Sequence, residues 1–393
     1  MKSLFTNARI ILPPGDGVTH GSVLVEGGEI IQVNLMEDKI SSIDPDHLID
    51  CAGDYLAPGL IDMHCHGAMG CDAMEATPEA FDTILRHHAS HGTTTTVLTT
   101  VAASLAEMLA VLKCAEVYRT GEGRCGSLLA GIHLEGPYLS PRRRGAHRVE
   151  MLRDPSHEET SRLLNYASVI RRMTLAPELP GALDLVRELN RNGIAPSAGH
   201  SDATEEESRA GFKAGITQVT HLHNAMSSLR KTGPTPMRGL AEAALETPGV
   251  VCELIADGMH VPVELLRESW IAKGWREIML VSDATAGAGL GEGESFELGG
   301  LACRVEGNAA WTGEDDARCL AGSTATLFDG VGTMVAEVGV PLEEAVAMAT
   351  LVPAIALGLE QEIGSIAPGK AANLIRFNDH WEIKEVWIQG KAR

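Results

Sequence analysis

The sequence has little positive charge. Its 32 Lys and Arg residues stand against 53 Asp and Glu residues, which gives a formal net charge of −21. A surface this acidic repels nucleic-acid phosphates and anionic lipids, so we expect neither nucleic-acid nor membrane partners. An anionic small molecule would still need positive charge inside one pocket, because net charge describes the surface as a whole.

Long apolar runs and paired cysteine motifs are also absent. The N-terminal segment MKSLFTNARIILPPGDG holds only a short apolar run, broken by Pro13 and Pro14, which predicts neither a signal peptide nor a membrane span. The eight cysteines include no CxxC pair, so we interpret them as reduced thiols of a cytoplasmic protein. The remaining composition, 44% hydrophobic and 22% charged, is typical of a globular protein with a sizeable core.

Short β-rich runs alternate with helical stretches through the middle of the chain. We predict eight strands, at residues 56–64, 93–100, 128–134, 173–176, 194–198, 217–221, 250–256 and 278–282. Eight is the number of strands that closes a TIM-type barrel, in which strands alternate with helices. The predicted fold class is therefore α/β, with a (β/α)8 barrel.

The two ends of the chain have a different pattern, with β-like runs separated by Gly and Pro turns. Since chain termini often lie together, we predict one small β-sandwich domain from residues 1–55 and 363–393, and a barrel domain from residues 56–362. The Gly- and Glu-rich stretch 289–313 predicts a hairpin inserted after the last barrel strand.

Polar motifs follow six of the eight predicted strands: DMHCHG, HLEGPY, AGHSDA, THLHNAM, ADGMH and SDATAG. Barrel enzymes build their active sites at these carboxyl ends of the strands. His64 and His66 lie two residues apart, so both imidazoles project from one face of an extended strand. Imidazoles and carboxylates suit zinc or ferrous-type divalent ions, which make amide hydrolysis accessible at neutral pH.

The same motifs carry a resemblance to a known family. The stretches PGLIDMHCHG (58–67), GIHLEGPYL (131–139), GHSDAT (199–204), THLHNAM (220–226) and VSDATAGAG (281–289) resemble the N-acetylglucosamine-6-phosphate deacetylase family of the amidohydrolase superfamily. The resemblance spans nearly the whole chain. It implies hydrolysis of the acetyl group of an N-acetylated amino sugar phosphate, a divalent metal, and a homodimer.

The resemblance also implies metal ligands. Glu135, His200 and His221 are the expected ligands of the principal metal. His64 and His66 are the expected ligands of a second metal, with Glu135 as a bridge. Zinc is the first expectation and ferrous iron the alternative, and the number of ions, one or two, stays open.

Catalytic and substrate-binding residues follow in the same way. Asp283 resembles the carboxylate that accepts a proton from the attacking water and returns it to the departing amine. His147 is expected to donate to the substrate and to steady the oxyanion. The resemblance implies that the sugar phosphate is held by His147, Asn224, Ala225, His260, Ala321 and Gly322.

One position departs from the family pattern. Where the family usually carries an arginine that a neighbouring subunit directs toward the phosphate, this sequence has Thr232, and Arg230, Lys231 or Arg238 are alternatives for that charge. The cluster Arg142 to Arg144 is either an attraction for an anionic sugar or a solvated loop. Deacylation of the galacto epimer or of another N-acyl amine, and a non-catalytic scaffold role, are the alternative functions.

Overall fold

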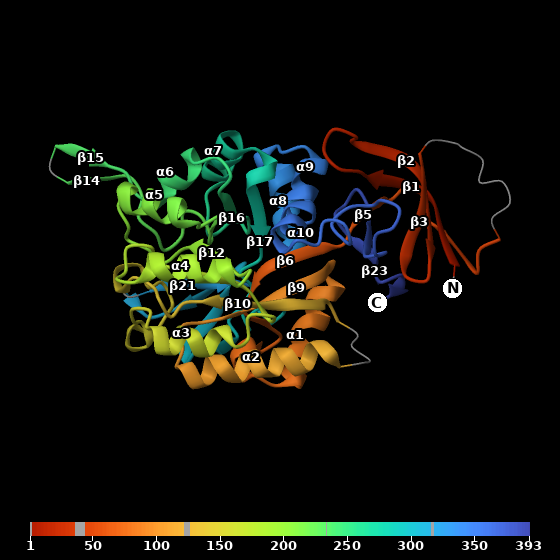
Figure 1. Ribbon diagram of the computed structural model, residues 1–393. Helices are drawn as coiled ribbons and strands as arrows, with labels where there is room; N and C mark the ends of the chain where they lie inside the picture. The colour runs from red at the N-terminus through yellow and green to blue at the C-terminus, as the bar shows by residue number, and fades with distance from the viewer. Residues whose placement is uncertain (1, 36–43, 122–125, 233, 316–317) are drawn as a thin grey trace.

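The computed structural model describes residues 2–35, 44–121, 126–232, 234–315 and 318–393. Cys125 of the predicted thiols lies outside these residues. In Figure 1 the barrel and the helices around it lie at the left, and the sheet built from both chain ends lies at the right. None of the helices in the described part of the chain is long and apolar enough to cross a membrane.

The barrel is one parallel sheet of eight strands, ordered β17-β16-β13-β12-β11-β10-β9-β6. Its strands are β6 (Leu60–Cys65), β9 (Thr93–Thr100), β10 (Leu128–Glu135), β11 (Ile170–Leu175), β12 (Ala195–Ala198), β13 (Gln218–Val219), β16 (Val251–Ile255) and β17 (Ile278–Val281). Hydrogen bonds from the Asp283 N–H to the His64 carbonyl (2.9 Å) and from the His66 N–H to the Ala284 carbonyl (2.7 Å) join its two ends. The predicted (β/α)8 fold is confirmed.

Helices follow the strands and cover the outside of the barrel (Figure 1). They are α1 (Pro78–Ser90), α2 (Leu105–Thr120), α3 (His157–Leu164), α4 (Ala182–Arg191), α5 (Glu205–Ala214), α6 (Leu240–Glu246), α7 (Val263–Lys273), α8 (Leu327–Thr333), α9 (Leu342–Met348) and α10 (Leu351–Leu357). Several begin at a side-chain cap: Thr204 and Glu207 form a capping box at α5, directly after the GHSDAT motif. Such caps fix where each loop after a strand ends.

Both chain ends build one β domain, as predicted, and this domain holds a second sheet of eight strands. Its order is β24-β23-β22-β5-β1-β2-β3, with β4 paired to β1. The strands are β1 (Lys2–Ile11), β2 (Val18–Glu26), β3 (Glu29–Leu35), β4 (His47–Asp50), β5 (Tyr55–Pro58), β22 (Leu374–Phe377), β23 (Ile383–Ile388) and β24 (Lys391–Ala392). Phe5 packs edge-on against Trp387 with ring centroids 4.8 Å apart, which ties the two ends of the chain together in one core.

The first predicted strand, 56–64, is two strands in the structure. β5 is hydrogen-bonded to β1 and β22 in the terminal sheet, and the barrel strand β6 begins only at Leu60. Gly59 lies between them, and a Cβ atom at this position would collide with the Thr94 side chain. The division into domains 1–55 with 363–393 and 56–362 therefore stays a prediction, with β5 lying across its first boundary.

The predicted insertion after the last barrel strand is larger than a hairpin. Four antiparallel strands, β18 (Ser295–Leu298), β19 (Leu301–Glu306), β20 (Ala309–Thr312) and β21 (Cys319–Ser323), form a sheet of their own. Its last strand, β21, reaches back to the barrel, where the Ser323 N–H donates to the Asp283 carbonyl (2.8 Å). A second, smaller hairpin, β14 (Arg230–Thr232) and β15 (Thr235–Met237), projects from the barrel near α5 and α6 (Figure 1).

Candidate metal centre and active site

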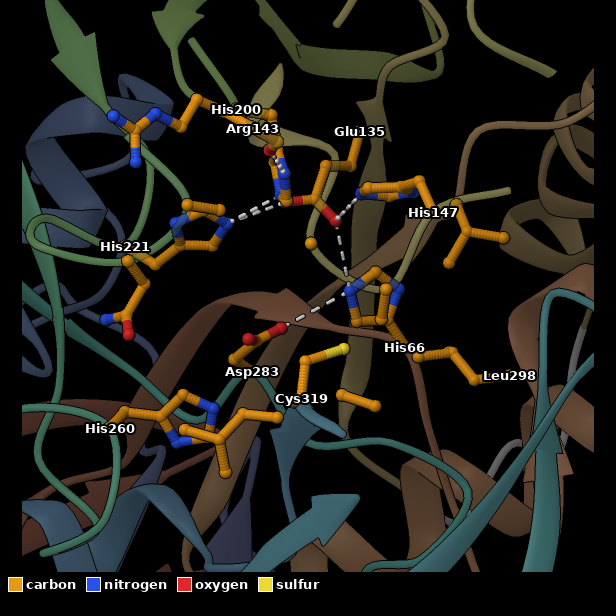
Figure 2. Close-up of a pocket in the computed structure, with 18 of the residues that line it drawn as sticks. His66, Glu135, Arg143, His147, His200, His221, His260, Asp283, Leu298 and Cys319 are labelled. Atoms are coloured by element: carbon orange, nitrogen blue, oxygen red, sulfur yellow. Dashed lines mark hydrogen bonds and ion pairs between the residues drawn. The ribbon is translucent and has the colours of Figure 1, made fainter. Parts of the chain in front are cut away.

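A cavity of about 330 Å³ opens at the carboxyl ends of the barrel strands. Its lining includes nearly every residue predicted for the site: His66, Glu135, His147, His200, His221, Asn224, Ala225, His260, Asp283, Ala321 and Gly322. His64 is the exception, because it is fully buried just below the cavity wall. Figure 2 shows the imidazoles of His66, His147, His200 and His221 arranged around the Glu135 carboxylate.

Glu135, at the end of β10, lies between two groups of side chains. Its Oε1 atom lies 3.1 Å from Nε2 of His221 and 3.2 Å from Nε2 of His200. Its Oε2 atom lies 3.3 Å from Nε2 of His66, and Oε1 lies 3.5 Å from Nε2 of His64. One carboxylate thus faces both sets of imidazoles.

Two sets of donor atoms are close enough to hold a metal ion. Glu135, His200 and His221 form one set, and His64, His66 and Asp283 form the other; within each set the ligand atoms lie within 4.8 Å of one another. Every member of both sets is buried. Imidazole nitrogens and carboxylate oxygens are the ligands that zinc and ferrous ions take in hydrolytic sites.

Hydrogen bonds at Nδ1 orient two of the histidines so that their Nε2 atoms face the Glu135 carboxylate. The Nδ1–H of His200 donates to the Arg143 carbonyl (2.9 Å), and the Nδ1–H of His64 donates to Glu253 Oε2 (3.2 Å). In a neutral imidazole the other nitrogen, Nε2, then carries a lone pair. Nε2 of His200 lies only 3.0 Å from Nε2 of His221, a spacing of two ligand nitrogens that fits a shared cation.

Neighbouring carboxylates raise the pKa of both histidines of the second donor set. Burial lowers the pKa of His64, but the carboxylates of Glu135, Asp283 and Glu253 outweigh burial and raise this pKa well above its usual value. The pKa of His66 is raised to about 9, against burial, by Asp283 and Glu135. Binding of a cation must therefore release protons from this pair.

The two carboxylates respond in the opposite direction. Burial raises the pKa of Glu135, but the positive charge of His64 and the contacts with the imidazoles of His147, His200 and His221 hold it well below its usual range. The pKa of Asp283 is likewise held low, against burial, by His64 and His66. Both groups are ionised at neutral pH, so they are available as a ligand and as a proton acceptor.

The loops that present these side chains have an unusual backbone. His200, His221, Ala225 and Asp283 have φ values of 45°, 31°, 46° and 49°, in the left-handed region that residues other than glycine seldom adopt. Gly322 has a φ of 74°, and a Cβ atom there would lie 2.7 Å from the Asp283 carbonyl oxygen. Only glycine permits β21 to approach Asp283 this closely.

His147 and His260 reach the cavity from two different loops. The Ala102 N–H donates to Nδ1 of His147 (3.2 Å), so the proton of the neutral ring lies on Nε2, 3.5 Å from Glu135 Oε2. Nδ1 of His260 lies 2.6 Å from Asp257 Oδ2. Burial lowers the pKa of His260, but Asp257 raises it above its usual value overall.

Positive charge gathers at one side of the cavity. Arg142 and Arg143 line it, and both guanidinium groups contact Asp202, at 3.4 Å and 2.9 Å respectively. Arg230 contacts the same carboxylate at 3.2 Å. One carboxylate does not neutralise three guanidinium groups, so this cluster, Arg142, Arg143, Arg230 and Asp202, keeps a positive charge in an acidic protein.

The residues predicted as alternatives for the missing arginine lie in different places. Arg230 lies in the cluster beside the cavity, whereas Arg238 pairs with Glu205 and Glu246 on α5 and α6. Thr232 lies in β14, on the projecting hairpin. Of the other predicted cluster, Arg142 and Arg143 line the cavity and Arg144 is absent from its lining.

Three residues that contribute to the site escaped the sequence analysis. Glu253 stands in the middle of β16, with no polar motif to mark it, and contacts His64 from below. Leu298 and Cys319 reach the cavity wall from the inserted sheet (Figure 2).

Besides the two donor sets, a third buried group, Asp62, Cys65 and His88, has the spacing of metal ligands. Asp62 is already engaged by Ser282 and the His64 N–H, and Cys65 Sγ lies 3.0 Å from His88 Nε2.

Comparisons with known proteins agree with this geometry. The model of the amidohydrolase family matches residues 55–393. An N-acetylglucosamine-6-phosphate deacetylase of Vibrio furnissii is 35% identical over 338 residues, which are 86% of this chain and 82% of the relative. An N-acetylgalactosamine-6-phosphate deacetylase of Escherichia coli O157:H7 is 34% identical over 364 residues, 92% of this chain and 94% of the relative.

A solved structure extends the likeness to three dimensions. A mutant N-acetyl-D-glucosamine-6-phosphate deacetylase of Mycobacterium smegmatis, in complex with N-acetyl-D-glucosamine-6-phosphate, superposes with a TM-score of 0.90 at 31% identity. The superposition covers 100% of this chain and 99% of that one. Amidohydrolases are metal-dependent enzymes that cleave amide bonds, which suits the two donor sets described above. The chain belongs to the amidohydrolase family and, within it, to the N-acetylglucosamine-6-phosphate deacetylases.

Proposed function

We propose that this enzyme hydrolyses the acetamide of N-acetylglucosamine 6-phosphate to glucosamine 6-phosphate and acetate. The observation that carries the proposal is one cavity in which Glu135, His200, His221 and Asp283 meet a positively charged rim. Relatives that span nearly the same length carry the name of this activity. A phosphorylated substrate accounts for the arginines beside a hydrolytic centre.

The metal is proposed to bind to the two donor sets. Glu135, His200 and His221 would hold the principal ion, and His64 and His66 a second one, with Glu135 shared between them. Zinc is the first candidate, and ferrous iron the alternative, because both accept imidazole and carboxylate ligands. When bound, the metal supplies Lewis-acid activation of the amide carbonyl and of the attacking water.

Asp283 is proposed to move the proton. Its ionised carboxylate borders the cavity and accepts a proton from the attacking water. The same group then delivers this proton to the amine nitrogen, because an amine leaves poorly until it is protonated. Such proton transfer contributes about 10²- to 10⁴-fold to a rate.

His147 and the sugar-binding residues complete the proposed site. His147, whose Nε2–H points into the cavity, donates to the oxygen that becomes negative during attack. His260, made more basic by Asp257, and the Arg142–Arg143 rim would attract the phosphate. Asn224, Ala225, Ala321 and Gly322 shape the wall around the sugar.

The galacto epimer is a second candidate substrate. A relative named for N-acetylgalactosamine 6-phosphate is 34% identical over 92% of this chain. The metal and Asp283 act on the acetamide, which both epimers share.

We further propose that the protein forms a homodimer and is located in the cytoplasm.

Steady-state acetate release tests the assignment. N-acetylglucosamine 6-phosphate, its galacto epimer and unphosphorylated N-acetylglucosamine are assayed in parallel. The highest kcat/KM is expected for the phosphorylated glucosamine compound. A higher kcat/KM for the galacto epimer would transfer the assignment to that sugar, and hydrolysis of only another N-acyl amine would refute the substrate while retaining the amidohydrolase.

A further inference from the structure

A fully buried carboxylate contacts both donor sets from inside the barrel. Glu253 stands in the middle of β16 and has no exposed surface. Its Oε2 atom accepts the Nδ1–H of His64 (3.2 Å) and the backbone N–H of His221 (3.0 Å). His64 belongs to one donor set and His221 to the other, so a single oxygen atom supports both.

The other oxygen of Glu253 is held by an equally buried arginine. Nη1 of Arg172, on β11, donates to Glu253 Oε1. Nη2 of Arg172 donates to Ser197 Oγ (2.9 Å) and to Thr220 Oγ1 (3.3 Å). The carboxylate is thus fixed between the arginine on one side and the ligand residues on the other.

Neither residue lines the cavity, so the pair does not touch a substrate there. A buried ion pair is costly to form, and burial alone does not explain its presence beneath a metal centre. The contacts of Glu253 with the proposed ligands His64 and His221 explain why the pair lies there. Because a carboxylate paired with arginine only accepts hydrogen bonds, Glu253 requires a proton on Nδ1 of His64 and leaves the Nε2 lone pair toward the centre.

The contact with His221 has a separate consequence. His221 presents its imidazole from a backbone with a φ of 31°, and the hydrogen bond from its N–H to Glu253 holds that conformation. His64 and His221 stack with ring centroids 5.6 Å apart. Their relative position is therefore set by one common anchor.

We infer that Glu253, anchored by Arg172, is a positioning residue that aligns His64 and His221 for metal binding and couples the two donor sets. The inference rests on the proposed metal-dependent function. It does not make Glu253 a ligand, since Glu253 contacts the Nδ1 atom of His64 and does not line the cavity. It adds to the site a pair of charges that the ligand motifs do not contain.

Metal affinity tests the inference. Zn²⁺ binding is measured by competition with a chromophoric chelator, and Co²⁺ binding by its visible absorption spectrum. In E253Q/R172M, which removes both charges together, we expect affinity to fall about 10- to 100-fold, the usual effect of losing a partner of a ligating histidine. The Co²⁺ spectrum should change as well, because the orientation of His64 changes.

A second variant keeps both charges. E253D retains a charge for Arg172 but shortens the side chain by one methylene, so its carboxylate no longer reaches Arg172, His64 and His221 together. It should lose metal affinity in the same range. This variant covers the case in which E253Q/R172M does not fold.

The matched control removes another ion pair that includes a buried lysine. Lys273 Nζ contacts Glu277 Oε2 at 2.5 Å on the outer side of the barrel, and neither residue contacts a ligand. K273M/E277Q should lose thermal stability but retain wild-type metal affinity within threefold. Wild-type affinity in E253D, or in folded E253Q/R172M, would overturn the inference. A wild-type protein that binds metal but deacetylates no N-acetylhexosamine phosphate would refute only the proposed function.

Discussion

Oδ1 of Asp283 lies 3.2 Å from Nε2 of His64, where the loop after β17 meets the end of β6. Their backbones are joined as well, because the Asp283 N–H donates to the His64 carbonyl (2.9 Å). The proposed proton acceptor is thus fixed to the strand that carries a proposed ligand. Closure of the barrel between its last and first strands brings the two together.

Replacement of Asp283 by asparagine should separate metal binding from turnover. Asn has nearly the same shape but does not accept a proton from water, so kcat should fall by about 10²- to 10⁴-fold. The metal held by Glu135, His200 and His221, measured by elemental analysis, should remain, because these three residues are unchanged. Undiminished kcat in Asp283→Asn would remove Asp283 from the mechanism.

Replacement of Glu135 by glutamine should remove metal and activity together. Glu135 faces both donor sets, and an amide is a much weaker ligand than a carboxylate. We expect elemental analysis to find little metal in Glu135→Gln. His66→Ala is the comparison, because it leaves the set of Glu135, His200 and His221 complete. If Glu135→Gln retains its full metal content, Glu135 is not a principal ligand.

Replacement of Arg143 by alanine should weaken selection of the phosphate. Loss of one charge-assisted hydrogen bond costs about 1.5–3 kcal/mol, so KM for the phosphorylated sugar should rise by about tenfold or more. KM for the unphosphorylated sugar should change less than twofold. Arg187→Ala, on the exposed face of α4, serves as the control. Equal changes for the two sugars would exclude a phosphate contact by Arg143.

The His260–Asp257 pair predicts a pH-dependent stability. The raised pKa of His260 stabilises the fold fully below the ordinary histidine pKa and loses this effect as the pH rises through the raised value. Burial raises the pKa of Asp257, but His260 lowers it overall, so its contribution is present above the ordinary aspartate pKa and is lost as the pH falls through the lowered value.

The pair is therefore most stabilising between about pH 4 and pH 6.5. The Tm difference between the metal-free wild-type protein and His260→Gln should be largest near pH 6 and should shrink toward pH 9. Thermal unfolding monitored by circular dichroism measures it. A Tm difference that is constant over this range would show that the ion pair contributes nothing through its charges.

The barrel and the polar residues that line its cavity were predictable because their signals are local. Each β-rich run is followed by a polar motif, and the closed barrel brings those motifs together, as for Glu135 and His221. The end of the first predicted strand, residue 64, lies one residue before the end of β6 at Cys65, but its beginning was wrong. Residues 56–58 have the composition of a barrel strand, and only their pairing with β1 and β22 assigns them to the terminal sheet.

Pairings between distant residues were beyond prediction from one sequence. Glu253 and Arg172 are 81 positions apart, and nothing in either strand indicates that its partner lies across the barrel interior. Asp202 likewise contacts guanidinium groups from two separate segments, the loop after β10 and the β14–β15 hairpin. A charged residue inside an apolar run signals only that some partner exists, and the fold decides which one.

The left-handed backbone at His200, His221, Ala225 and Asp283 has a consequence for how this protein can change over evolution. Each such conformation in a residue other than glycine costs roughly 1–2 kcal/mol, so the four together cost on the order of 4 kcal/mol or more. That is a large part of the net stability of an ordinary protein. Adaptation to heat is therefore expected in the outer helices and the terminal sheet, because relaxing these four loops would misdirect the side chains they present.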